Sequence, residues 1–525
     1  MFILDTNIRF LDTELNSIKF IFIMFFKIQN LTNIMEKNIA IVFDCGATNV
    51  RVVAITREGK IIASKSMPNN TDEDPHLKGG RIWDIDKLWN KLSVASQYVM
   101  SEIDTNRIAD VTFTTFGVDG TFVDNNGNIL YPVISWQCER TESIVNQIDQ
   151  YISNEDLYEI SGVFPYAFNT IYKMKWFKDN KPELFKKAYR FLFIPSLLIN
   201  KLSGTLKNDI TMVGTSMMTD LKKRDFSEKI LSALEIVSSL FGEIAQPGDK
   251  AGEVNERGYK DTMIPIGTPV FFAGHDTQFA VFGSGADLNE PVLSSGTWEI
   301  LMGRSSINTL KKVSIESNLT RELDVQNGIC DTGQNWLGSG ILEWFFKNFY
   351  SGLQGRELYN KIDADVELVE DGKSGLLINP DFYKEADASS GGSIKGLTIA
   401  TKREEIYEAL LESLSFRLRE AMEALQDAGG FKASQIICVG GGSKNKRWNQ
   451  LRADICQLPI KLIDQKETTV LGASFFVFVG AKLAPSVEDA RKEVEYKPEI
   501  ILPNISKKDF WDERYKIYLK NKQQN

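Results

Sequence analysis

The stretch Ile39-Ala-Ile-Val-Phe-Asp44-Cys-Gly-Ala-Thr-Asn-Val-Arg51 decides the fold class of this chain. Its first five residues are apolar and mostly β-branched or aromatic, so they predict a buried strand. The strand runs into a short loop that contains Gly46 and Thr48. A glycine lets consecutive backbone N–H groups turn toward an anion, and a small hydroxyl side chain adds a donor without blocking the approach. The stretch therefore predicts a strand that ends in a phosphate-binding loop.

A second loop of the same kind is Ser294-Ser-Gly-Thr-Trp298, which follows the apolar residues 291–293. Neither loop is a Walker P-loop, because the chain contains no GxxxxGK[ST] string. A pair of ordinary β-turns is the alternative, since D-x-G and S-G-T are common turn sequences. Asp44 favours a functional interpretation, because a carboxylate beside phosphates repels them unless a cation such as Mg²⁺ lies between. We therefore expect a metal–nucleotide site with Asp44 on the metal side.

Another apolar strand ends in a polar cluster at Phe271-Phe-Ala-Gly-His-Asp-Thr-Gln-Phe279. An acidic group at the tip of a strand is well placed to take a proton from a substrate hydroxyl, so we predict that Asp276 is a general base. His275 beside it has two open interpretations, a satisfied structural histidine or a substrate contact. We expect a substrate contact and no proton transfer. Thr277 and Gln278 are predicted to contact substrate as well.

The segment Ile436-Ile-Cys-Val-Gly-Gly-Gly-Ser-Lys-Asn-Lys-Arg-Trp-Asn449 joins a predicted strand to a predicted helix through three glycines. Three glycines let a flat ligand face lie against the backbone, because no Cβ is in the way. Ser443, Asn445 and Asn449 can hydrogen-bond the edge of such a ligand. A flexible linker is the alternative, but linkers do not usually follow a buried strand and precede a helix. We predict contact with an adenosine.

In this order the four elements resemble the FGGY family of carbohydrate kinases, of the sugar kinase, actin and Hsp70 type. The resemblance extends from about residue 38 to about residue 494. Longer strings such as TTFGVDG, YPVISWQCERT, AGHDTQFAVFG and EPVLSSGTWEIL are similar to the L-fuculokinase group of that family. The L-rhamnulokinase group, which shares a His-Asp-Thr cluster, is the alternative.

The resemblance implies an α/β fold of two actin-like (ribonuclease H-like) domains with a nucleotide and sugar cleft between them. It implies ATP-dependent phosphorylation of a ketose, L-fuculose at its 1-hydroxyl and D-ribulose as a further substrate, with ATP and Mg²⁺ required. Asp276 matches the catalytic base, and Asp44 matches the acid that orients the metal. The other matched positions are Gly46, Thr48, Asn49 and Arg51 in the first phosphate loop, Ser295, Gly296 and Thr297 in the second, Gly440, Gly441 and Gly442 with Ser443 and Asn445 at the adenosine, and Asp119 and Gly120 facing the sugar.

Length and composition agree with an ordinary globular chain of more than one domain. The chain has 525 residues, of which 43% are hydrophobic, and its net charge is −9. An acidic balance argues against a general nucleic-acid binder, which needs a basic face. Five scattered cysteines without CxxC or zinc spacing indicate reduced thiols and a cytoplasmic protein. A homo-oligomer is compatible with the sequence, and no membrane partner is expected.

Four segments are predicted. Residues 1–34 are predicted to be a non-native extension before a start at Met35, since the segment that begins with Met35 leads directly into the strand before Asp44. The apolar run Phe20–Phe26 within the extension is too short to span a bilayer. A membrane-associating arm is the alternative for this run. Residues 35–285 form an N-terminal domain with the sugar site, first loop and base. Residues 286–483 form a C-terminal domain with the second loop and adenosine site, and residues 484–525 form a tail.

A function of another class also fits an actin-like chain, namely a non-catalytic ATP-binding module or a sugar sensor. A sensor of this kind would be expected to carry a helix-turn-helix extension, and none is found in the sequence. A catalytically dead relative would be expected to have lost Asp276 or Asp44, and both are present. The sequence therefore favours an active kinase.

Overall fold

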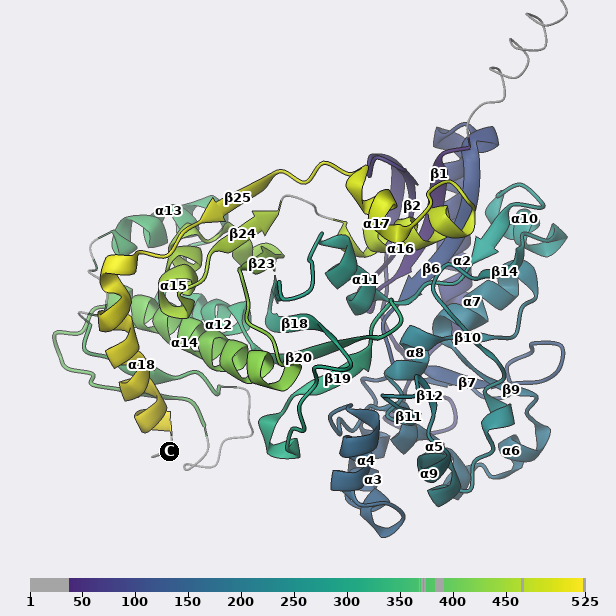
Figure 1. Cartoon of the computed structure of the whole chain (residues 1–525), viewed down its shortest axis with the longest axis horizontal. Helices are drawn as coiled ribbons and strands as arrows, with labels where there is room; N and C mark the ends of the chain where they lie inside the picture. Colours follow the sequence, from purple (N-terminus) through teal and green to yellow (C-terminus); the bar gives the residue numbers. More distant parts are fainter. Residues whose placement is uncertain are drawn as a thin grey trace, which may run out of the picture.

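The computed structural model describes residues 37–367, 369, 372, 374–382, 391–463 and 467–522. The predicted extension over residues 1–34 and the predicted start at Met35 lie outside the described residues. Two seven-stranded sheets, one in each half of the chain, form the framework (Figure 1).

The first sheet is built around residues 39–51, the strand and loop that contain Asp44. β1 (Ile39–Cys45) is buried along its whole length, as expected for a central strand covered on both faces. It pairs antiparallel with β2 and parallel with β6, and its end brings Asp44 beside Thr114 of β6. The other strands of this sheet are β2 (Asn49–Thr56), β3 (Ile61–Pro68), β6 (Ile108–Thr115), β14 (Lys250–Glu253), β15 (Pro269–Phe271) and β16 (Gly274–His275).

The second sheet repeats this order. In both sheets a central strand forms an antiparallel ladder on one side and runs parallel to two later strands on the other. An antiparallel strand closes the parallel edge each time. The strands are β19 (Thr320–Leu323), β20 (Ile329–Leu337), β18 (Trp298–Ser306), β17 (Val292–Ser295), β23 (Ile436–Val439), β24 (Ile460–Ile463) and β25 (Pro498–Ile501). The predicted α/β class with two similar units is confirmed.

Helices cover both faces of the first sheet. α2 (Ile85–Glu102) and α7 (Ile194–Ser203) pack on one face. α11 (Asp276–Gly283) and α16 (Thr468–Gly480) pack on the other, so a helix from late in the sequence lies beside β1 (Figure 1). The two helices cross where Gly472 meets α11, and a Cβ on Gly472 would lie 2.0 Å from the carbonyl oxygen of Phe279. Only glycine permits so close a crossing.

The second sheet is covered by α14 (Arg403–Gly429), α12 (Ser339–Phe349), α13 (Gly355–Val366) and α15 (Lys446–Cys456). In the sequence REEIYEALLESLSFRLREAMEAL the leucines recur at intervals of three and four residues, a pattern that predicts a helix with one apolar face. This segment forms α14, and its leucines pack into the core. After residue 484 the chain forms α17 (Val487–Lys492), β25 and α18 (Lys508–Lys522). The predicted domain boundaries at 285 and 483 stay predictions. No helix within the described part of the chain could cross a membrane.

Candidate active site

Asp44 lies at the end of β1, where its carboxylate is held from two sides. Its Oδ1 accepts a hydrogen bond from Thr114 Oγ1 at 3.0 Å, and its Oδ2 lies 2.6 Å from Arg51 Nε. Arg51 is opposite Asp44 in the β1–β2 ladder, which explains their contact. The same guanidinium pairs with Glu467 at the start of α16. Arg51 therefore ties the first loop to a helix from the other half of the chain.

The first loop is a tight turn between β1 and β2. The backbone N–H of Gly46 donates to the carbonyl of Asn49 at 2.9 Å, and the Asn69 side chain donates to the carbonyl of Gly46 at 2.9 Å. Thr48 and Asn49 are exposed at the tip. The turn is thus internally fixed while its polar tip stays open to a ligand.

Asp276 is the first residue of α11 and is partly exposed. About a quarter of its side chain, 28%, is accessible, so a substrate hydroxyl can reach it. Burial of the rest of the group raises the pKa of Asp276 to about 6; the negative charge of Asp44 adds to the rise, and His275 opposes it. The carboxylate is therefore mostly ionised at pH 7 and able to accept a proton.

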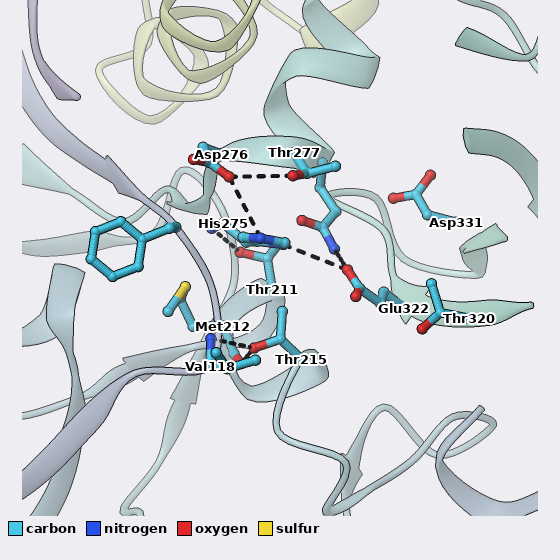
Figure 2. A network of polar contacts seen from close by, with 12 residues as sticks. Val118, Thr211, Met212, Thr215, His275, Asp276, Thr277, Thr320, Glu322 and Asp331 are labelled. Atoms are coloured by element: carbon cyan, nitrogen blue, oxygen red, sulfur yellow. Dashed lines mark hydrogen bonds and ion pairs between the residues drawn. The ribbon is translucent and has the colours of Figure 1, made fainter. Parts of the chain in front are cut away.

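The neighbours of Asp276 form a network that includes a residue from the second sheet (Figure 2). Thr277 Oγ1 donates to Asp276 Oδ1 at 3.3 Å, and His275 Nε2 lies 3.5 Å from the same oxygen. On its other side, His275 Nδ1 lies 3.5 Å from Oε2 of Glu322. Gln278 also donates to Glu322.

The second loop presents Ser294 and Thr297 outward and keeps Ser295 inside. Ser294 and Thr297 are exposed, whereas Ser295 is fully buried. Ser295 Oγ donates to Glu299 Oε1 at 2.9 Å and accepts from Arg452 Nη2 at 2.7 Å. Its side chain therefore braces the loop from below.

A pocket of about 460 Å³ lies between the second loop, α11 and the start of α16. One wall is the backbone at Gly440 and Gly441, and a Cβ added at Gly441 would meet no atom within 4 Å. The rest of the lining is mostly apolar, with a few hydroxyl groups: Thr277, Ala280, Val281, Val292, Ser294, Ile300, Met302, Val439, Ser443, Lys444, Ile463, Thr468 and Thr469. An apolar wall with a few polar groups at its edge suits a flat heterocycle.

Two family models match almost all of this framework. The N-terminal domain of the FGGY family of carbohydrate kinases matches residues 39–283, and the C-terminal domain of that family matches residues 292–481. The chain belongs to the FGGY family of carbohydrate kinases.

Relatives and solved structures agree with this membership. The chain is 40% identical over 469 residues to an L-fuculokinase of Escherichia coli K12, covering 89% of this chain and 98% of that protein. It is 38% identical to an L-fuculokinase of Haemophilus influenzae, covering 89% and 100%. In structure it is similar to a ligand-bound xylulose kinase from Lactobacillus acidophilus, with a TM-score of 0.82 at 21% identity over 92% of this chain and 98% of that one. A Plasmodium falciparum glycerol kinase with ADP gives a TM-score of 0.80 at 20% identity over 93% and 98%.

In this carbohydrate kinase the predicted sugar contacts Asp119 and Gly120 lie inside the protein. Both are buried. Burial raises the pKa of the Asp119 carboxyl, and the buried ammonium of Lys173 opposes the rise. The carboxylate also accepts from Trp83 Nε1 at 2.7 Å and from the backbone N–H of Trp136 at 3.0 Å. Asp119 therefore supports Trp136, a residue that is 37% exposed, and offers no surface of its own to a sugar.

Other predicted residues of the kinase take supporting positions as well. Asn445 caps α15 by accepting from the backbone of Trp448 at 3.0 Å and donates to Tyr407 Oη at 2.9 Å. Asn449 donates to the carbonyl of Ser443 at 2.7 Å. These amides fix the loop at 440–445 and do not line the pocket. Gln278 is buried, and Thr277 lines the pocket of the second loop.

Sequence reasoning missed Glu322, Ser294 and Trp136. Ser294 directly precedes Ser295, and only burial tells the two serines apart. Glu322 contacts His275 across 47 positions of sequence, and no local pattern indicates such a contact. Trp136 lies in the string YPVISWQCERT, which the sequence analysis used only for the family resemblance.

Proposed function

We propose that this kinase transfers the γ-phosphate of ATP to the 1-hydroxyl of L-fuculose, giving L-fuculose 1-phosphate and ADP. The observation that carries the proposal is the 38–40% identity to L-fuculokinases over nearly the full length of those relatives. The site geometry supports phosphoryl transfer, because a partly exposed carboxylate on α11 lies within electrostatic reach of Asp44, and its neighbour Thr277 lines the same pocket as Ser294 of the second loop.

In the proposed reaction Asp276 accepts the proton of the 1-hydroxyl. The freed oxygen bonds to the γ-phosphorus while the bond from that phosphorus to the bridging oxygen of ADP breaks. Backbone N–H groups and exposed hydroxyls of Thr48, Ser294 and Thr297 hold the phosphate oxygens. The adenine lies against the Gly440–Gly441 backbone. Catalysis is then mainly positioning and charge stabilisation.

Asp44 is the proposed holder of Mg²⁺. The described residues contain no group of three or more His, Cys, Asp or Glu that could hold a metal by themselves. Mg²⁺ in kinases is commonly bound through one or two carboxylates, waters and the substrate phosphates. The single, largely buried carboxylate of Asp44 fits this kind of site. When bound, the ion would neutralise phosphate charge. The role of this chain is to fix the carboxylate through Thr114 and Arg51.

Asp44→Ala is expected to weaken the use of Mg²⁺. Activity at low Mg²⁺ should fall, and raising the concentration should recover part of it, because the carboxylate only helps to hold the ion. Titration of initial rates with Mg²⁺ measures the effect. Thr114→Val keeps the carboxylate and removes one of its two supports, so its Mg²⁺ dependence should shift less than that of Asp44→Ala. An Asp44→Ala variant with wild-type Mg²⁺ dependence would contradict the role.

The proposed reaction is tested by identifying the products. With L-fuculose and MgATP, the wild-type kinase should release one ADP per sugar consumed, and ³¹P–¹H NMR should place the new phosphate on the C1 methylene. If the protein bound ATP but released no ADP with any added sugar, the non-catalytic alternative would be favoured instead. A phosphate on another carbon would contradict the assigned acceptor.

We further propose that the protein works in the cytoplasm. All five cysteines are free, and four of them are buried. Unpaired buried thiols are typical of a reducing compartment. Fractionation of the source cells would test this.

A further inference from the structure

Glu322 reaches the neighbours of the catalytic base from the opposite half of the chain. Its Oε2 lies 3.5 Å from His275 Nδ1 and 2.5 Å from Gln278 Nε2. Figure 2 shows His275 between Asp276 and this carboxylate. Only 14% of the Glu322 side chain is exposed, so its charge acts in a medium of low dielectric constant.

The imidazole of His275 has little room to turn. A Cβ added at Gly117 would lie 2.9 Å from its Nε2, and the backbone N–H of His275 donates to Thr211 Oγ1 at 2.9 Å. Within the described residues its buried Nδ1 makes no hydrogen bond of good geometry, so the nearby Glu322 is its main electrostatic partner. The ring is thus fixed between Glu322 and Asp276.

The strand that carries Glu322 is fixed to both halves of the molecule. β19 pairs with β20 in the second sheet. β19 is also bound to the first half of the chain. The backbone N–H of Arg321 donates to the carbonyl of Gly162 at 2.8 Å, and Thr320 Oγ1 accepts from the backbone N–H of Phe164 at 3.3 Å. The distance from Glu322 to His275 is therefore set by contacts between the halves.

We infer that Glu322 is a positioning residue, which holds His275 and Gln278 so that Asp276 stays oriented and ionised for proton transfer. The inference rests on the proposed role of Asp276. The carboxylate of Glu322 favours a positive charge on His275, and that charge favours the anionic form of Asp276.

The charged groups around this network come from four elements. Asp276 on α11 and Glu322 on β19 face His275, Asp44 on β1 acts on Asp276, and Asp331 on β20 lies next to Glu322. Burial lowers the pKa of His275, but Glu322 and Asp276 outweigh burial, so its pKa is raised overall. Burial raises the pKa of Asp331 well above its ordinary value, and the negative charge of Asp324 adds to the rise.

Glu322→Gln tests the inference, because it keeps the shape of the side chain and removes its charge. We expect kcat to fall about 10- to 100-fold, since small displacements of reacting groups are costly. The acid limb of the pH profile, where kcat/KM falls as the pH is lowered, should move to higher pH. The Kd for MgADP should stay unchanged. Glu322→Asp keeps the charge and should keep the wild-type acid limb, even if kcat falls.

Asp331→Asn is the matched control, since it alters the carboxyl opposite Glu322 in the β19–β20 ladder, which is not among the groups that shift the pKa of His275 or Asp276. It should leave the acid limb in place. A Glu322→Gln variant with wild-type kcat and acid limb would overturn the inference. A Glu322→Gln variant with a lower kcat, a lower Tm and an unchanged acid limb of kcat/KM would also overturn the inference, because that pattern indicates a purely structural role. Failure of the proposed reaction would be seen separately, in the wild-type kinase and in Asp276→Asn.

Discussion

Asp276→Asn is expected to lower kcat about 10²- to 10⁴-fold, because the variant keeps the shape of the site and removes the proposed general base. Binding of MgADP should change little, since Asp276 does not line the proposed nucleotide pocket, to which α11 contributes Thr277, Ala280 and Val281. Initial rates at saturating sugar and ATP, together with calorimetric binding of MgADP, measure both quantities. Normal turnover by Asp276→Asn would show that another group takes the proton.

The wild-type pH profile provides an independent check on the same residue. The pKa of Asp276 is raised to about 6 by burial and by Asp44. An acid must be ionised to accept a proton, so kcat/KM should be constant above this value and fall about tenfold per pH unit well below it. The variant should lack this limb. A wild-type profile that is flat from pH 7 to pH 5 would contradict the assignment.

Arg452→Met is expected to cause the largest loss of stability. Arg452 and Glu299 form an ion pair with no exposed surface, and Arg452 also donates to Ser295 and Asn449 behind the second loop. Removing one partner leaves a buried charge without compensation, which costs about 3–5 kcal/mol. Urea denaturation should show this loss, and MgADP should bind more weakly because Ser295 loses its support.

A second substitution separates the charge effect from the loss of packing. In Arg452→Met/Glu299→Gln the orphaned charge is gone, while the amide oxygen can still accept from Trp336 Nε1. Part of the lost stability should return. Lys312→Met breaks an exposed pair with Glu159 and should change stability by less than about 1 kcal/mol. If the single variant were as stable as wild type, the pair would not support the loop.

The sequence was sufficient for features whose signals are local. Asp44 and Asp276 each follow an apolar strand directly, so their place at strand ends could be predicted, and the structure brings them within electrostatic reach of each other. The α/β class followed from the same strands. The amphipathic pattern predicted α14, because its apolar face repeats at helical spacing.

Features that depend on long-range packing could not be predicted. α16 is apolar all round, which identifies a buried helix but not the sheet it covers, and it packs on the first sheet. Asp119 has the residue type of a substrate contact, yet Lys173, Trp83 and Trp136 surround its carboxylate. Glu322 is brought to His275 only by the meeting of the two halves.

The specificity constants for L-fuculose, D-ribulose and L-rhamnulose, measured side by side, test the central claim most directly. L-Fuculose should rank first. D-Ribulose shares its configuration near the reacting end and lacks the terminal methyl group, so it should lose about 10- to 200-fold in kcat/KM. L-Rhamnulose keeps the methyl group but differs in hydroxyl configuration, which leaves buried polar groups unpaired, so it should rank below D-ribulose. A higher kcat/KM for L-rhamnulose than for L-fuculose would contradict the account and assign the kinase to L-rhamnulose.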